Sequence, residues 1–172
     1  MSGNHLDVGV GTGYFLDHCR FPALPERPRL ALMDISTSCL EVASKRVARF
    51  DPELIEANVL EPIAYEGPRF DSVGLNYVLH CLPGDIRSKA VALDHLIALA
   101  NPGAWLFGAT LLHDGVDRSW LARKVMDRNN SHGIFSNADD TLDGLRSALS
   151  DRLSDSSVHV VGCVGIFAGR VQ

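Results

Sequence analysis

The sequence predicts one α/β domain over residues 1–172, built on a mostly parallel sheet with helices on both faces. Short apolar runs alternate with segments of helical periodicity, which is the pattern of right-handed βαβ units. A glycine-rich stretch follows the first apolar run, at the carboxyl end of a strand, where such sheets bind their ligands. Two β-rich runs close the chain as a hairpin, which should add one antiparallel strand.

The apolar runs give the strands in order. The first and second are continuous, as expected for strands buried on both faces. The third is weaker, and the closing pair turns near Gly162 and Cys163. The predicted strands cover residues 5–10, 29–35, 53–60, 70–82 and 104–112, followed by the hairpin in 157–171.

Five segments are predicted as helices. Prolines within residues 22–28 must end the first, and Ser36 or Ser38 caps the second, with Glu41 placed for a capping box from Ser38. The third is strongly periodic and stops at the Asn-Pro-Gly turn signal. The helical ranges are 12–21, 36–50, 84–100, 116–130 and 139–153.

Composition excludes several classes of function. The net charge of −5 argues against a nucleic-acid partner and against an anionic membrane surface. The four cysteines are scattered without metal-ligand spacing, so we expect reduced thiols, a cytoplasmic location and no metal site. Neither a signal peptide nor an uninterrupted membrane-spanning stretch is visible.

The sequence HLDVGVGTGYF, residues 5–15, carries Gly9, Gly11 and Gly13 in the spacing G-x-G-x-G. A dinucleotide fingerprint needs glycine where Tyr14 stands, and a Walker loop needs a Gly-Lys-Ser/Thr ending that is absent. The loop therefore permits close approach of a ligand to the backbone without an obvious pyrophosphate site. A tight strand-to-helix turn that binds nothing is the alternative.

The stretch LDVGVGTG resembles motif I of the class I S-adenosylmethionine-dependent methyltransferases. Four later features resemble further motifs of that family, in the same order along the chain. They are Asp34, the stretch ANVLEP at 57–62, the stretch FDSVGLNYVLHCLPG at 70–84 and the turn into 104–112. The resemblance covers residues 5 to about 112 and accounts for the closing hairpin. It implies a Rossmann-like three-layer sandwich whose seven strands have the order 3-2-1-4-5-7-6, with only strand seven antiparallel.

The resemblance also implies S-adenosylmethionine as the cofactor. Asp34 stands 21 residues after Gly13, where an acid of the family holds both ribose hydroxyls, and a helix-cap role near Ser36 is the alternative. Asn58 replaces an acid that often accepts from the adenine amino group; its amide can accept and donate, and a turn-forming role is the alternative. The implied cofactor-binding residues are Asp7, Gly9, Gly11, Gly13, Asp34, Ile35, Asn58, Val59 and Asn76.

Two histidines are candidate catalytic bases. Asn76 is expected at the carboxyl end of the fourth strand, so His80 follows that strand and His113 follows the fifth. Both should therefore lie on the ligand side of the sheet. A hydroxyl acceptor would benefit from such a base, although positioning and water exclusion supply much of the rate of methyl transfer. A structural or exposed role is the alternative for each histidine.

Residues 113–136 are expected to form a substrate-facing insertion, because this region commonly shapes the acceptor pocket in the family. On a helix here Leu121 and Val125 would pack on the body, whereas Trp120 and Met126 would wall a pocket, as would Phe135. A surface helix with an apolar inner stripe is the alternative.

Family members usually carry helices before motif I, whereas only Met-Ser-Gly-Asn precedes the first strand here. We therefore expect an exposed cofactor site. Three explanations stay open: a truncated or degenerate copy, closure by a second subunit in a homodimer, or closure by the segment after the fifth strand.

The favoured function is methyl transfer from S-adenosylmethionine to a small organic molecule that is uncharged or weakly charged. The alternative is a truncated or degenerate protein of the same fold that binds the cofactor or a partner without efficient catalysis. A nicotinamide oxidoreductase is disfavoured by Tyr14.

Overall fold

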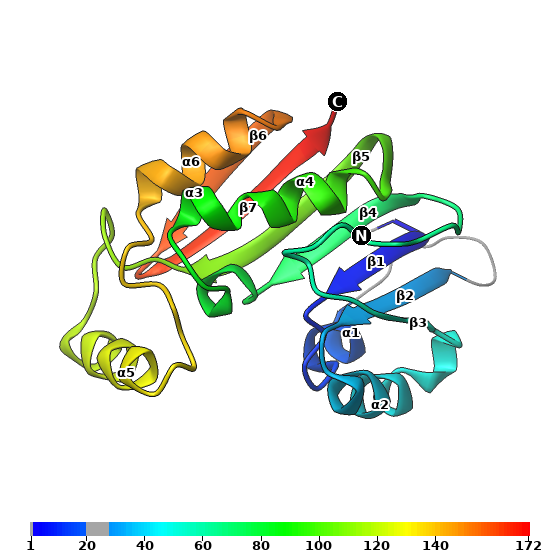
Figure 1. Cartoon of the computed structure of the whole chain (residues 1–172), viewed down its shortest axis with the longest axis horizontal. Helices are drawn as coiled ribbons and strands as arrows, with labels where there is room; N and C mark the ends of the chain where they lie inside the picture. Colours follow the sequence, from blue (N-terminus) through cyan, green and yellow to red (C-terminus); the bar gives the residue numbers. More distant parts are fainter. Residues whose placement is uncertain (1, 20–27) are drawn as a thin grey trace.

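The computed structural model describes residues 2–19 and 28–172. A seven-stranded sheet runs through it in the order β3-β2-β1-β4-β5-β7-β6 (Figure 1). β1 to β5 pair in parallel, and β7 is antiparallel to both β5 and β6. The predicted strand order and the single antiparallel strand are confirmed. The strands are β1 (Asn4–Val8), β2 (Arg29–Asp34), β3 (Glu53–Glu56), β4 (Phe70–Asn76), β5 (Ala100–Leu111), β6 (Leu153–Val161) and β7 (Val164–Val171).

Strand ends differ from the predicted ones. The third strand ends at Glu56, before its predicted end at residue 60. The fourth ends at Asn76, as expected from its motif, and the later part of the apolar run 70–82 includes the 3₁₀ turn η2 (Leu79–Cys81). The Asn-Pro-Gly turn at 101–103 lies inside β5 instead of before it. Phe70 pairs with Ala100 and Ser72 with Trp105, so the turn bulges out of the sheet, where a proline without an N–H is tolerated.

The helices follow the predicted segments with three main differences. The predicted helix 36–50 is an α-helix only to Arg46 and continues as a 3₁₀ turn. The predicted helix 84–100 is divided by a turn at Ala90 into α3 and α4. The first helix ends at His18, and residues 20–27, which include most of the proline segment, lie outside the described residues. The helices are α1 (Tyr14–His18), α2 (Thr37–Arg46), α3 (Ile86–Lys89), α4 (Val91–Ile97), α5 (Trp120–Ser131) and α6 (Leu142–Ser150), with the 3₁₀ turn η1 (Ala48–Phe50) after α2.

Side-chain caps fix where four helices begin. Ser36 caps α2 by accepting from the Cys39 N–H, so the predicted Ser38–Glu41 box is not the cap used. A reciprocal capping box forms instead between Asp85 and Ser88 at α3. Each cap satisfies an N–H that the helix leaves without an internal partner. Ser119 and Thr141 cap α5 and α6 in the same way.

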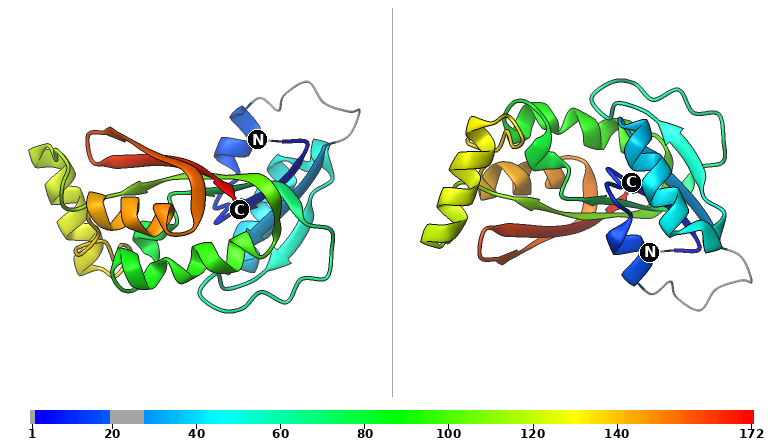
Figure 2. Two further views of the ribbon diagram at one scale, coloured as in Figure 1. Left: turned by 90° about the horizontal axis from the view of Figure 1, so that it is seen from above. Right: turned by 90° about the horizontal axis from the view of Figure 1, so that it is seen from below.

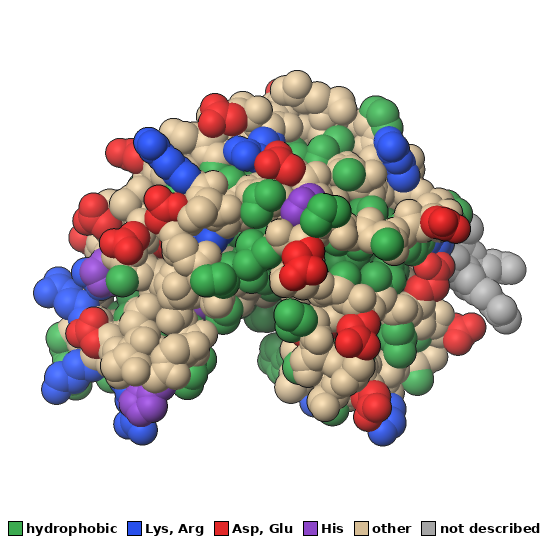
Figure 3. All heavy atoms as spheres, in the orientation of Figure 1, with side chains coloured by type: hydrophobic (Ala, Val, Ile, Leu, Met, Phe, Trp, Pro, Cys, Tyr) green, Lys and Arg blue, Asp and Glu red, His purple; other side chains and the backbone are tan. Residues whose placement is uncertain are grey.

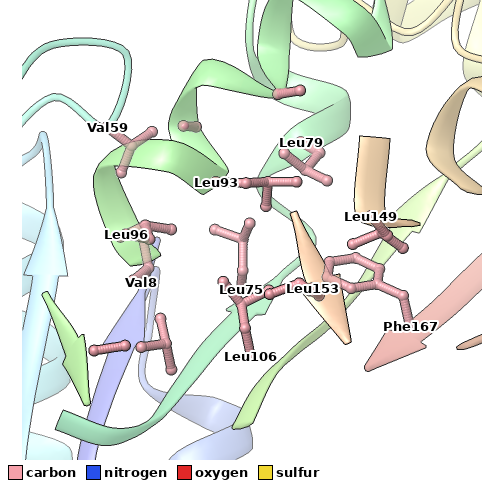
Figure 4. Close-up of a cluster of buried hydrophobic side chains, with 14 of the residues drawn as sticks. Val8, Val59, Leu75, Leu79, Leu93, Leu96, Leu106, Leu149, Leu153 and Phe167 are labelled. Carbon is pink, nitrogen blue, oxygen red and sulfur yellow. The ribbon is translucent and has the colours of Figure 1, made fainter. Parts of the chain in front are cut away.

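Successive apolar side chains of β2 point to opposite faces of the sheet and so contribute to a core on each face. Leu30 and Leu32 pack with Leu16 of α1 and with Leu40 and Ala43 of α2. Ala31 and Met33 belong to the larger core on the opposite face, which α3, α4 and α6 cover (Figure 2). Figure 4 shows this larger core, where leucines of α4 and α6 meet Leu75, Leu106 and Phe167 of the sheet. The predicted three-layer arrangement is confirmed.

The helix α5 projects away from both cores (Figure 1). The prediction that Leu121 and Val125 pack on the body is wrong, because these side chains are 56% and 47% exposed. Met126 is the buried side chain of α5, and Trp120 is the most exposed large apolar one. The face that packs inward is therefore rotated from the predicted one. Within the described ranges, no helix is long and apolar enough to cross a bilayer.

A buried ion pair ties α3 to the segment between α5 and α6. Lys89 Nζ lies 2.6 Å from Asp140 Oδ2, and both side chains are fully buried. Lys89 also donates to the Ser136 carbonyl at 2.6 Å. Burial raises the pKa of Asp140, against the opposing effect of Lys89. Because the Asp140 carbonyl accepts from the His113 N–H, the pair also positions the exit of β5.

We expect Lys89→Met to lower the free energy of unfolding by about 3–5 kcal/mol, because it leaves the Asp140 carboxylate buried without its cation. The double variant Lys89→Met/Asp140→Leu should recover a large part of this loss, since neither charge then remains. Urea denaturation at pH 7 measures both values. Equal instability of the single and double variants would show that the pair is not the source of the effect.

Candidate functional site

Gly9, Gly11 and Gly13 all have positive φ, but for different reasons. A Cβ at Gly9 would collide with the Val78 side chain, and one at Gly13 would lie 3.1 Å from Ala43 Cα in α2. These two glycines let β1 approach the end of β4 and let the loop approach α2. At Gly11 a Cβ would meet nothing within 4 Å, so this backbone faces open space.

A pocket of about 490 Å³ opens beside Gly11 at the carboxyl ends of β1, β2 and β4. Its volume is in the range of sites that bind small ligands. Six of the nine predicted cofactor residues line it, together with apolar side chains from the end of β4. The lining residues that were predicted are Gly9, Gly11, Asp34, Ile35, Asn58 and Val59.

Asp34 is held by backbone donors at the edge of this pocket. Its Oδ1 accepts from the Ser36 N–H at 3.0 Å, and its Oδ2 accepts from the Gly11 N–H at 3.3 Å. The carboxylate thus links the glycine loop to the start of α2. Ser36, not Asp34, is the helix cap.

Asn58 occupies the predicted place but is engaged in a turn. Its Oδ1 accepts from the Leu60 N–H, and its Nδ2 donates to Glu61 Oε1, both at 3.0 Å. The turn-forming alternative therefore describes this side chain in the structure. Val59 beside it is 7% exposed and joins the larger core.

A second pocket of about 440 Å³ contains two other predicted residues, Asp7 and Asn76. Asp7 is 7% exposed, and its Oδ1 lies 3.8 Å from His5 Nε2. Phe15 and Phe107 also line this pocket and were missed in the sequence. Their positions on a helix and a strand look like ordinary core residues, so no sequence signal singles them out. Gly13 is the one predicted cofactor residue that lines neither of these two pockets, and it allows close packing on α2.

His80 is buried directly after the end of β4. Its side chain is 3% exposed, and its Nδ1 has no hydrogen-bond partner in the described part of the chain. Its ring meets Tyr77 and Phe135 edge to face, with centroids 5.9 and 4.7 Å away. Burial, assisted by the charge of Lys89, lowers the pKa of His80 to about 4. The imidazole is therefore neutral at pH 7 and presents an acceptor lone pair or an N–H, depending on its tautomer.

His113 lies farther along the same edge of the sheet. It is half-buried, and its backbone N–H donates to the Asp140 carbonyl at 2.9 Å. Neither His113 nor His80 is among the described residues that line the two pockets. Phe135, which belongs to the predicted insertion 113–136, packs edge to face against His80.

The surface is hollowed between the part that carries α5 and the part that carries α1 and α2 (Figure 3). The carboxyl ends of the central strands lead into this hollow. No group of three His, Cys, Asp or Glu side chains in residues 2–19 and 28–172 is arranged to hold a metal ion.

Comparison with known proteins gives consistent matches. A family model described as "Methyltransferase domain" matches residues 1–145. Demethylluteothin O-methyltransferase of Streptomyces thioluteus is 41% identical over 97% of this chain and 72% of its own length. Methyltransferase verB of Penicillium polonicum is 40% identical over 96% of this chain and 78% of its own length. The N-methyltransferase NodS from Bradyrhizobium japonicum, solved with S-adenosyl-L-homocysteine, has a TM-score of 0.65 at 17% identity, over 98% of this chain and 77% of NodS.

The buried neutral His80 predicts a pH dependence of stability. Between its ordinary pKa of 6.5 and about 4, the unfolded chain binds a proton on this ring that the folded chain does not. The free energy of unfolding should therefore fall as pH decreases through this window, by about 3 kcal/mol from this group.

Urea denaturation measures this contribution. The free energy of unfolding is determined at pH 7 and at pH 4 for the natural chain and for His80→Gln, and the loss on acidification is compared between the two proteins. Carboxylate titration is common to both proteins and cancels. If the two proteins lose the same stability on acidification, the pKa of His80 is not lowered.

Proposed function

This chain belongs to the methyltransferase-domain family, and from that premise we propose that it transfers a methyl group from S-adenosylmethionine to a hydroxyl oxygen of a small organic acceptor. The observation that carries the proposal is the open backbone at Gly11 beside the fixed carboxylate of Asp34, in the larger pocket. The choice of oxygen as the methylated atom is supported by the similarity to the Streptomyces O-methyltransferase.

The larger pocket fits the adenosine part of this cofactor. Asp34 is already oriented by two N–H groups, and a carboxylate can accept from both hydroxyls of a ribose. Val59 and the 67% exposed Ile35 offer apolar surface to the adenine ring. Asn58 would bind the adenine amino group only by releasing its turn contacts.

The second pocket fits the methionine part. The ammonium group of the cofactor is a cation, and Asp7 is a nearly buried carboxylate that such a cation would complement. Asn76 adds an amide that can donate to a carboxylate. We assign Gly9 and Gly11 to the backbone contact between the two parts, and we assign Gly13 an indirect role through packing on α2.

S-adenosylmethionine, when bound, supplies a methyl group on a positively charged sulfur. His80 would accept a hydrogen bond from the acceptor hydroxyl and so orient its lone pair. A full proton transfer before attack is disfavoured: from a phenol of pKa about 10 to an imidazole of pKa about 4 it costs about 8 kcal/mol. His80 would therefore take the proton only as the new carbon–oxygen bond makes that oxygen acidic. His113 is the alternative base.

We keep the remaining expectations as proposals. The net charge of −5 supports a partner other than nucleic acid, and the absence of Cys/His ligand spacing supports reduced thiols in a cytoplasm. Trp105 and Ile166, which are 40% and 45% exposed on the side of the sheet away from the larger core, support a homodimer. Residues 113–136 would shape the acceptor site from α5 and Phe135.

Calorimetric titration with S-adenosylmethionine, S-adenosylhomocysteine and NAD tests the cofactor site. We expect saturable binding of the two sulfur compounds and none of NAD. Asp34→Ala and Asp34→Asn should each weaken S-adenosylhomocysteine at least about tenfold, because charge-assisted hydrogen bonds to the ribose are lost.

Glu41→Ala is the matched control, since Glu41 is an exposed acid on α2, and its affinity should stay unchanged. Binding of NAD alone would overturn the cofactor assignment. Unchanged affinity in both Asp34 variants would reject the ribose contact.

Turnover with a panel of phenols, carboxylates and amines separates an efficient enzyme from a protein that binds the cofactor without efficient catalysis. We expect methylation of a phenol, with kcat reduced about 100-fold in His80→Gln, the loss typical for removal of an acid–base group. His113→Gln is measured beside it. A larger loss in His113→Gln would transfer the role of base to that residue, and no turnover on any acceptor would favour the binding protein.

A further inference from the structure

Phe15 of α1 and Tyr77 after β4 form a stacked pair of exposed rings at the edge of the candidate site. Their centroids are 5.8 Å apart with an interplanar angle of 15°. The side chains remain 53% and 38% exposed although large apolar rings favour burial. We call Phe15 and Tyr77 the aromatic pair. Resting on the proposed function, we propose that the aromatic pair is the binding platform for a planar aromatic ring of the methyl acceptor.

The aromatic pair stands where the two pockets meet. Tyr77 lines the larger pocket beside Gly9 and Gly11, and Phe15 lines the second pocket beside Asp7 and Asn76. A molecule resting on the pair therefore lies next to both parts of the proposed cofactor site. An acceptor must occupy such a junction, because its reacting oxygen has to reach a group held between the two pockets.

The backbone of Tyr77 is held in an unfavourable conformation. Its φ is +60°, in the left-handed region that bulky residues avoid at a cost of about 1–2 kcal/mol. The Tyr77 N–H donates to the Ala109 carbonyl at 2.7 Å, and Val78 is pressed against Gly9, so neighbouring strands enforce the turn. This conformation orients the ring toward Phe15. Strain of this kind concentrates at ligand sites.

The aromatic pair continues into the candidate base. The Tyr77 ring meets His80 edge to face, and His80 meets Phe135 in the same way. His80 carries the partnerless, buried Nδ1, which a hydroxyl on the bound ring could satisfy after the ring enters. The two features together require a ligand that has a flat apolar face and a hydroxyl at its edge.

The chemistry of the walls favours a planar, uncharged ring over an aliphatic or anionic acceptor. Parallel rings offer an extended face to which another ring stacks in the offset arrangement that aromatic quadrupoles prefer. A puckered aliphatic ring cannot match that face. In the chain without cofactor, the nearly buried Asp7 carboxylate in the second pocket repels an anion.

Calorimetric binding of 2-naphthol tests the platform, with decahydro-2-naphthol as the non-planar control of the same carbon skeleton. Both are titrated into the full chain with and without saturating S-adenosylhomocysteine. We expect 2-naphthol to bind at least about tenfold more tightly than its saturated analogue. Phe15→Leu and Tyr77→Asn should each remove most of that preference, whereas Tyr77→Phe should retain it.

Asparagine is chosen at position 77 because it tolerates positive φ, so the ring is lost without adding backbone strain. Trp105→Leu is the control for nonspecific binding to an exposed aromatic ring: Trp105 is 40% exposed and lines neither of the two pockets. Its preference should be unchanged.

The outcomes separate the two proposals. Failure of S-adenosylhomocysteine to bind would count against the proposed function, while the naphthol titration of the free chain still tests the platform. Equal binding of the planar and saturated rings would overturn the platform. An unchanged preference in both Phe15→Leu and Tyr77→Asn would also overturn it, as would an equal loss in Trp105→Leu.

Discussion

The close approach of the glycine loop to its neighbours is the constraint on which the site depends. β1 is central in the sheet, so the chain leaving it must pass between the end of β4 and the helix α2. Side chains at Gly9 and Gly13 would strike Val78 and Ala43. With both absent, the loop lies low enough for Gly11 to donate to Asp34 and still face open space. The absence of side chains at Gly9 and Gly13 therefore allows the close packing of β1, β4 and α2 and forms the floor of the larger pocket.

The remaining parts of the site are attached to that floor through buried polar contacts. Lys89 and Asp140 lock α3 to the chain that returns from α5. In the same region the Ser136 N–H donates to the His80 carbonyl, and the Asn137 side chain donates to the end of β5. Because a buried charge is costly without its partner, these contacts define one arrangement of the segment. Phe135 is consequently held against His80 although α5 itself packs little on the body.

The chemistry that we propose is one of positioning, not of strong acids or bases. Burial and Lys89 keep His80 neutral, so its ring could accept a hydrogen bond from an acceptor hydroxyl at pH 7 without carrying charge. The one nearly buried carboxylate of the second pocket, Asp7, faces the place that we assign to a cation. Methyl transfer from a sulfonium removes a positive charge during the reaction, and an apolar, largely uncharged surrounding suits such a change.

The sequence alone determined the mostly parallel sheet and the closing antiparallel hairpin, because hydrophobic periodicity is a local signal. The order of the strands came from the resemblance of the motifs to the methyltransferase family. The sequence also singled out Asp34, Ile35 and Val59, which line the larger pocket because they lie at or just after the ends of β2 and β3. Only the tertiary structure decided the rest. In the structure, the predicted cofactor residues are divided between two pockets. The side chain of α5 that packs inward is Met126 instead of Leu121 and Val125. The Asn58 side chain is hydrogen-bonded within a turn. The tertiary structure also brought Phe15 onto Tyr77 and Lys89 onto Asp140. These contacts join residues far apart in the chain, and their geometry depends on how strands and helices pack, which no local pattern records.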